Sequence, residues 1–293
     1  MKKFYKISGI VAAIGLGIGL LCIMIGVAGG AVGTVYLTKG GFKINDQTER
    51  WQHTSDNETP FTSVDMDIDA AKVHILESED DQYKVEVDII GSKETITYSN
   101  TDGLLTIKND NKSNSFTINI FGGISNNPTG EVYIYVPKAV KLDKISINCD
   151  VGDVEIDVDT QVDRVNVTTD VGEITISNGT YKNVELKADV GDIQTEGATI
   201  TEKVVAKADV GEVTLDGNLS CDIDVSTDVG SINIKTSLSS DSYRCNVSAS
   251  AGEVEVFGVK DSGADVEIVG SEKAEYSIIA EASLGSIEIE SIK

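Results

Sequence analysis

The sequence predicts an all-β protein, a β-solenoid with coils of about 20 residues, preceded by one N-terminal transmembrane helix. Three observations lead to this prediction. The tripeptide Asp-Val-Gly recurs every 19 or 20 residues in the second half of the chain. Valine, isoleucine and threonine alternate there with polar residues, which is the period of a strand. Residues 7–38 contain no charged side chain, and about 20 such residues are enough to cross a bilayer as a helix.

These patterns divide the 293 residues into five segments. We expect a cytoplasmic N-terminus at 1–6, a transmembrane helix at 7–38, a linker at 39–60, an N-terminal β part of the solenoid at 61–140, and the Asp-Val-Gly repeat solenoid at 141–293.

The uncharged N-terminal run favours a membrane anchor over a cleaved signal peptide. The apolar part of a signal peptide spans about 7 to 15 residues, and this run is twice as long, although the small residues at 28–31 resemble a cleavage site. Three lysines precede the run and two follow it, which favours a cytoplasmic N-terminus. We therefore expect a single-pass cell-membrane protein whose C-terminal domain is extracytoplasmic. The opposite orientation, with a cytosolic domain, is the alternative.

Small residues form a continuous seam along the predicted helix. Their four-residue spacing lets two helices approach closely in lipid. The glycines with this spacing are Gly15 and Gly19, Gly26 and Gly30, and Gly29 and Gly33. We expect them to pack against a second copy of the chain or a partner membrane protein. The alternative is that glycine is simply common in membrane helices.

Charge is segregated along the chain. The net charge is -24, and all 48 acidic residues lie after residue 43, whereas the first 43 residues contain only basic charges. An acidic body repels phosphate polymers and attracts cations, cationic peptides and basic protein surfaces. Nucleic acid is therefore excluded as a partner, and envelope components or cationic peptides are favoured.

The repeat predicts a stack of similar coils. Its glycines are Gly152, Gly172, Gly191, Gly211 and Gly230. Strict alternation points Val171 inward but would also bury Glu173, so we expect the chain to bend at Gly172 with a positive φ. Cys149 and Cys245 fall at inward positions, where a free cysteine acts as a small apolar residue.

Strand patterns also precede the repeat. Val64, Met66 and Ile68 alternate with aspartates, as in a half-buried strand. Further strands are expected at 96–98, 104–107, 116–120 and 132–136.

Three of these features, in this order, resemble a known family. They are Val64-Asp-Met-Asp-Ile-Asp-Ala-Ala-Lys-Val-His-Ile, Val132-Tyr-Ile-Tyr-Val-Pro-Lys, and the train of Asp-Val-Gly repeats. Together they are similar to the bacterial putative-adhesin, or toastrack, domains over residues 61–293. The resemblance implies an extracytoplasmic β-solenoid, often attached to a membrane helix and associated with envelope stress responses. It implies no catalytic residues.

The chain offers little for catalysis. Only two histidines occur, His53 and His74, and no phosphate-binding loop or zinc motif is present. We therefore predict that the protein is not an enzyme. The sharper candidate is a column of aspartates that stacking would bring about one strand spacing apart, where Ca²⁺ could relieve their repulsion. These are Asp150, Asp170, Asp189, Asp209 and Asp228. The alternative is that each aspartate accepts backbone hydrogen bonds in its own turn. No other cofactor is expected.

The sequence thus favours a membrane-anchored binding or sensing module of the bacterial cell envelope. Two other functions remain open. The first is a purely structural surface adhesin or spacer. The second, ranked last, is a carbohydrate-active enzyme built on a β-helix.

Overall fold

A computed structural model describes residues 33–38, 41–45, 50–90, 95–109, 116–120, 130–138, 140–261 and 273–292. Contacts divide the chain into two compact units, residues 1–50 with 111–129 and residues 51–110 with 130–293. Within the described ranges the only helical segment is a single 3-10 turn, η1 (Ser240–Ser242), and no helix is long and apolar enough to cross a membrane. The predicted all-β class is therefore confirmed.

The first unit contains a three-stranded antiparallel sheet in the order β2, β1, β8. Its strands are β1 (Gly33–Thr38), β2 (Gly41–Asn45) and β8 (Phe116–Ile120). The end of the predicted transmembrane helix is thus wrong, because Gly33 begins a strand. Threonine, valine and tyrosine favour strands, and both edges of β1 find partners. The remaining candidate helix-packing residues lie outside the described residues: Gly15, Gly19, Gly26, Gly29 and Gly30.

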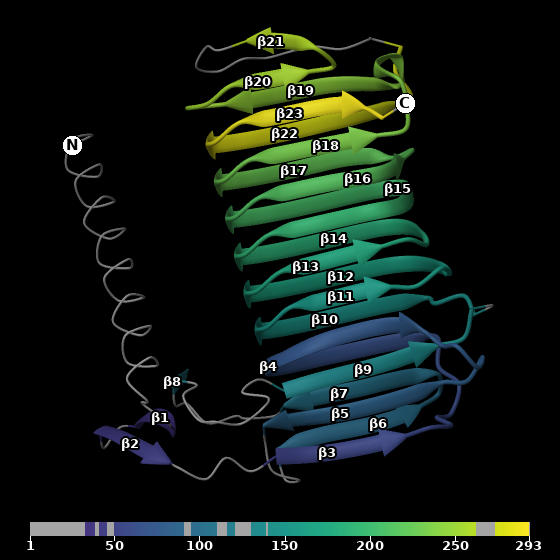
Figure 1. Cartoon of the computed structure of the whole chain (residues 1–293), viewed down its shortest axis with the longest axis vertical. Helices are drawn as coiled ribbons and strands as arrows, with labels where there is room; N and C mark the ends of the chain where they lie inside the picture. Colours follow the sequence, from purple (N-terminus) through teal and green to yellow (C-terminus); the bar gives the residue numbers. More distant parts are fainter. Residues whose placement is uncertain are drawn as a thin grey trace. The chain divides into compact units, whose positions relative to one another are not determined.

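The second unit stacks strands in two walls, which we name wall A and wall B (Figure 1). In stacking order, wall A contains β6 (Ile96–Thr101), β7 (Leu104–Asn109), the first half of β4 (Ser63–Glu77), β10 (Lys144–Val151), β12 (Gln161–Val171), β14 (Thr180–Val190), the second half of β15 (Ile193–Val210), β17 (Asp222–Val229), β22 (Tyr276–Leu284) and β19 (Tyr243–Ala249). In the same order, wall B contains β3 (Arg50–Ser55), β5 (Lys84–Ile90), β9 (Gly130–Val136), the second half of β4, β11 (Val154–Asp157), β13 (Ile174–Ser177), the start of β15, β16 (Val213–Leu219), β18 (Ile232–Thr236), β23 (Ile287–Ser291), β20 (Val254–Val256) and β21 (Val259–Asp261).

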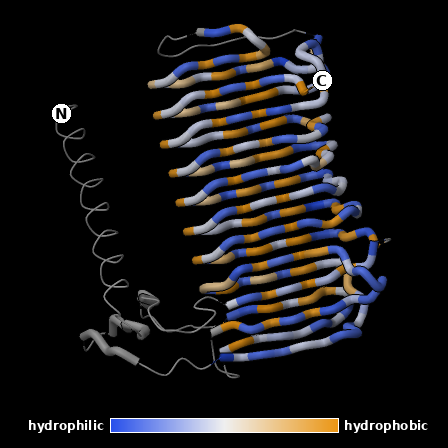
Figure 2. Tube along the Cα trace, in the orientation of Figure 1, coloured by the Kyte–Doolittle hydropathy of each residue, from blue (hydrophilic) through white to orange (hydrophobic). Residues whose placement is uncertain are grey.

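Neighbouring strands of the repeat pair in parallel and in register. Val165 of β12 lies opposite Ile145 of β10 and Val184 of β14. Buried and exposed residues therefore alternate in columns along the stack, as the hydropathy colours show (Figure 2). Side-chain parity in a strand makes this register specific, because a one-residue slip would expose every aliphatic side chain.

The two walls form one 20-stranded sheet that wraps around the core. They are joined because β4 and β15 each pass from one wall to the other without a break. The unit is in this respect closer to a closed barrel than to the predicted β-solenoid. The predicted linker at 39–60 is also too long, since β2 and β3 fall within it.

Aliphatic side chains fill the space between the walls. Val165, Val167 and Ile176 are completely buried. Cys149, Cys221 and Cys245 are buried free thiols, and burial raises the pKa of Cys149 and Cys245 to about 11. The inward placement predicted for Cys149 and Cys245 is confirmed. Such thiols are protonated and inert at neutral pH.

The C-terminal strands do not lie at the end of the stack. β22 pairs in parallel with β17 on one side and β19 on the other. β23 likewise lies between β18 and β20 (Figure 1). The last coil in sequence is therefore inserted between two earlier ones.

Candidate functional site

The Asp-Val-Gly tripeptides build one corner of the second unit, where wall A passes into wall B. Gly172 has φ 153° and Gly191 has φ 148°, a region that is essentially restricted to glycine. The predicted bend at a glycine with positive φ is therefore confirmed. This φ is far from the roughly +80° of an ordinary type II turn.

Stacking explains why glycine is needed at this corner. A Cβ on Gly191 would lie 1.9 Å from the carbonyl oxygen of Gly172, and one on Gly172 would lie 2.0 Å from that of Gly152. Each backbone thus occupies the space that a side chain on the next coil would need. We call this set the glycine column: Gly152, Gly172, Gly191, Gly211, Gly230, Gly285 and Gly252.

The residue before each glycine points outward, so the prediction that Val171 faces inward is wrong. Val171 and Val190 are each 48% exposed. Alternation holds only within a strand, and β12 ends at Val171, so Asp170 and Val171 are both exposed immediately before the bend at Gly172. The exposed residues at this position, neighbours by register, form what we call the valine ridge: Val151, Val171, Val190, Val210, Val229 and Leu284.

The predicted calcium ligands precede the ridge residues and form a first acidic column: Asp150, Asp170, Asp189, Asp209 and Asp228. Their strands are in register, so the structure brings them together as expected. Lys187 Nζ lies 2.6 Å from an oxygen of Asp189. No group of three or more His, Cys, Asp or Glu side chains suited to a metal ion occurs among the described residues. Calcium binding by this column stays a prediction.

A thermal melt tests the calcium prediction. If the column binds Ca²⁺, a concentration about 100 times the Kd stabilises the folded protein by about 2.7 kcal/mol. The Tm of the full chain should then rise in millimolar Ca²⁺, and the rise should vanish when Asp170 and Asp189 become Asn. An unchanged Tm in the unsubstituted chain would remove calcium from consideration.

Asp150 is the most perturbed carboxylate of the first acidic column. Partial desolvation, together with the carboxylates of Asp69, Asp170 and Asp67, raises its pKa to about 6 from 3.8. The folded state therefore holds this proton more tightly than the unfolded chain does. Ionised Asp150 destabilises the fold above about pH 6, and the penalty is lost as the pH falls from 6 through 3.8.

This linkage gives a pH-dependent prediction. Replacing Asp150 with Asn removes the ionised form, so we expect a higher Tm than that of the unsubstituted protein at pH 8. The difference should shrink below pH 6 and be gone below about pH 3.8. Parallel melts of the two proteins across this range measure it. A constant difference at all pH values would mean that ionisation of Asp150 is not the cause.

A second acidic column follows the glycines, and sequence reasoning missed its pattern. The short side chains accept backbone hydrogen bonds from the next coil: Asp153 from Glu173 N at 3.3 Å, and Asp192 from Glu212 N at 2.7 Å. Glu173 Oε1 instead accepts a hydrogen bond from Gln194 Nε2 at 2.9 Å. Aspartate and glutamate therefore alternate, and the hydrogen-bond pattern repeats every two coils. The signal in the sequence is the order Asp153, Glu173, Asp192, Glu212.

The two histidines lie on different strands and have other partners. His74 Nδ1 is 2.7 Å from Glu155 Oε2, and its ring stacks on Tyr133 with a centroid distance of 4.6 Å. The ring of His53 packs against Tyr98, with centroids 4.1 Å apart. In the described part of the chain, therefore, the hydrogen-bond partner of His74 is a carboxylate rather than a hydroxyl or thiol nucleophile.

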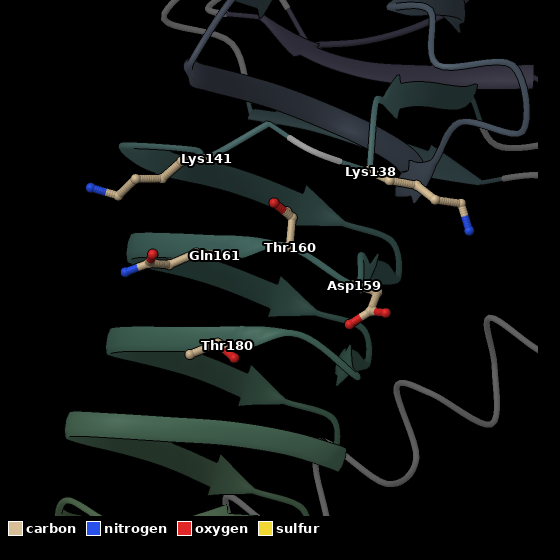
Figure 3. Close-up of a pocket in the computed structure, with 6 residues that line it drawn as sticks. All are labelled: Lys138, Lys141, Asp159, Thr160, Gln161 and Thr180. Atoms are coloured by element: carbon tan, nitrogen blue, oxygen red, sulfur yellow. The ribbon is translucent and has the colours of Figure 1, made fainter.

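An open depression of about 440 Å³ lies beside the opposite corner of the walls (Figure 3). Its two lysines extend away from each other in Figure 3 and are already paired, Lys138 with Glu77 at 2.6 Å and Lys141 with Asp163 at 2.5 Å. Its polar groups do not converge on a common point, as a small-molecule site requires. The corner with the valine ridge is therefore the stronger candidate.

Comparison with known proteins places the chain in a family. Solved structures that it resembles include a putative adhesin from Bacteroides fragilis (18% identity, TM-score 0.43, covering 84% of this chain and 98% of the other) and a putative cell adhesion protein from Clostridium sporogenes (17%, 0.39, 83% and 100%). A third, a putative lipid binding protein from Parabacteroides distasonis, has 14% identity and a TM-score of 0.34, covering 83% and 97%. Similarity this distant says nothing about ligands. No curated protein matches. Residues 61–290 match the family described as Toastrack DUF4097, and the chain belongs to that family, as the resemblance implied.

Proposed function

We propose that the protein is a binding module of the bacterial cell surface, anchored by residues 7–32 and carrying its acidic β unit on the extracytoplasmic side. The segregation of charge carries this proposal: an uncharged run follows three lysines, and every acidic residue lies beyond it. Even without β1, residues 7–32 exceed the roughly 20 residues that a spanning helix needs. Envelope components or cationic peptides are the partners that an acidic surface favours.

Binding is favoured over catalysis. The described histidines pack or pair with aromatic and acidic side chains, and the acidic residues recur at every corner of the repeat rather than at one place. A carbohydrate-active enzyme would need one pair of carboxylates with roles that their neighbours do not share. The enzyme alternative predicts that a single Asp substitution abolishes turnover of a glycan.

Labelling of intact cells tests the orientation. A membrane-impermeant amine reagent should modify exposed lysines of the repeat, such as Lys187 and Lys207, and leave Lys2, Lys3 and Lys6 unmodified until the cells are lysed. Labelling of the N-terminal lysines alone in intact cells would reverse the orientation and overturn the extracytoplasmic part of the proposal.

The glycine seam would couple the β unit to a second copy or another membrane protein. Replacing Gly19 and Gly26 with Leu should weaken self-association in a membrane reporter, because large side chains prevent close helix approach. Gly17→Leu is the matched control, since Gly17 lies off the seam. Equal association in all three proteins would remove the self-association proposal.

A structural spacer is the second candidate function. It is supported by the parallel stacking of successive coils, which would hold a binding end at a fixed distance from the membrane. This function predicts that deletion of one coil, residues 172–190, leaves binding to cells intact. A binding surface formed by the coils themselves predicts weaker binding.

A further inference from the structure

We propose that the valine ridge and its two acidic columns bind a cationic amphipathic α-helix of a partner. This inference rests on the proposed function as a binding module and names the surface and the partner class. Exposed aliphatic side chains in one unbroken line are unusual for a protein surface and mark interaction sites when charged residues rim them. Here the line crosses six successive coils.

The ridge is continuous and regular. Each residue is the register neighbour of the next, from Val151 through Val171 to Val190, and from Val229 to Leu284. Exposure rises from 39% at Val151 to 56% at Leu284. Parallel strands are about 4.8 Å apart, so six residues span about 24 Å along the stack. Figure 2 shows the hydrophobic colour recurring at successive left-hand corners of the stack.

This spacing fits a helix better than a strand. A helix presents an apolar group to one side once per turn, about every 5.4 Å, which differs from the ridge by about 0.6 Å per step. An extended chain presents a side chain to one face about every 6.7 Å. Its side chains would therefore be out of step with the ridge residues within two or three coils. About 16 helical residues at 1.5 Å each would cover the ridge.

The acidic residues on both sides of the valine ridge favour a partner with positive charge. The first acidic column precedes the ridge residues in sequence, and the second follows the glycines. Among the described residues, Asp189 has a lysine partner in the first column and Asp153 in the second. Asp192 and Glu173 of the second column also accept hydrogen bonds within the stack, but hydrogen bonds from neutral groups leave their negative charge in place to attract a cationic partner. A helix with one leucine stripe and lysines on either side would match both columns, whereas a second copy of this acidic corner would be repelled.

Binding of designed peptides to the full chain in zwitterionic nanodiscs tests the proposal, with empty nanodiscs as the reference. The probe is an 18-residue helix with one leucine stripe flanked by lysines. A peptide of the same length and composition, in which the same leucines alternate with lysines in one continuous segment, represents the strand. We expect the helical probe to bind at least about tenfold more tightly than the strand probe. Equal affinities would overturn the helix assignment.

Substitutions test the surface itself. Replacing Val171, Val190 and Val210 with Thr keeps shape and strand propensity but removes apolar contact, and we expect about tenfold weaker binding of the helical probe. Val259→Thr is the matched control, because Val259 is 58% exposed and lies off the ridge. Replacing Asp170 and Asp209 with Asn should weaken binding and reduce its salt dependence.

Three outcomes would overturn the proposal. The first is equal affinity in the ridge variant and the Val259 control. The second is equal binding of an oligolysine of the same charge, which would make the interaction purely electrostatic. The third is a dimer of the full chain that the ridge substitutions dissociate, which would make the ridge an interface between copies. External labelling of the repeat with no peptide binding would leave the proposed surface location standing and remove only this inference.

Discussion

Gly191→Ala is expected to unfold the protein or to lower its free energy of unfolding by about 4 kcal/mol or more. The added Cβ would lie 1.9 Å from the carbonyl oxygen of Gly172, and the backbone has φ 148°. Neither problem can be relieved locally, because the clashing atom is backbone held in register by parallel strands on both sides. Chemical denaturation of the full chain, followed by circular dichroism, measures the change.

Gly197→Ala is the matched control for this substitution. Gly197 also has a positive φ, 65°, but the nearest atom to an added Cβ is a side-chain oxygen at 3.9 Å. We expect a cost of about 1 kcal/mol, the usual penalty for a left-handed residue. If the two variants were equally destabilised, backbone conformation alone would explain the glycine, and the close approach of the coils would not be its cause.

Removal of the last coil is expected to have a similarly large effect. A chain ending at residue 274 would lack β22 and β23, which leaves β17, β18, β19 and β20 without one neighbour each. In a regular repeat protein the last coil contacts only one neighbour, so its removal breaks a single interface between coils. Here two interfaces between coils are lost, and we expect an insoluble or protease-sensitive product, measured by solubility and limited proteolysis.

A milder pair of substitutions keeps this prediction testable if the truncated chain does not fold. Ile278 is completely buried between β17 and β19, whereas its neighbour Ile279 is 40% exposed. Ile278→Ala should cost about 2 to 5 kcal/mol and Ile279→Ala about 0.5 kcal/mol or less. Equal effects would contradict the insertion of β22 into the core.

Local chemistry predicted much of this fold. The alternation around Val132 predicted a strand at 132–136, and the structure has β9 at Gly130–Val136. The repeat predicted the corner and its glycine. Alternation failed at Val171, because it assumes that the strand continues, whereas β12 ends at Val171 and the chain bends at Gly172. The sequence analysis consequently placed the valines in the core. It identified the acidic residues as candidate site residues but not the apolar ridge between them.

The position of the last coil could not be predicted from the sequence. Ile278 lies opposite Ile223 of β17 and Cys245 of β19, but the inward positions of the other coils carry similar small or aliphatic residues that would accept it equally well. Nothing local distinguishes insertion between β17 and β19 from addition beyond β19. The hydrogen bonds that Asp153 and Asp192 accept from the next coil could not be predicted either. The alternation of aspartate with glutamate gains a structural meaning only when the coils are known to pair in register.

The inserted coil also determines when the fold can be completed during synthesis. Coils from β10 to β18 can assemble in the order in which they are synthesised, each on the previous one. β19 and β20 emerge before β22 and β23, the strands that join them to the rest of the stack. The growing chain must therefore keep β19 and β20 out of their final positions until β22 and β23 have been synthesised.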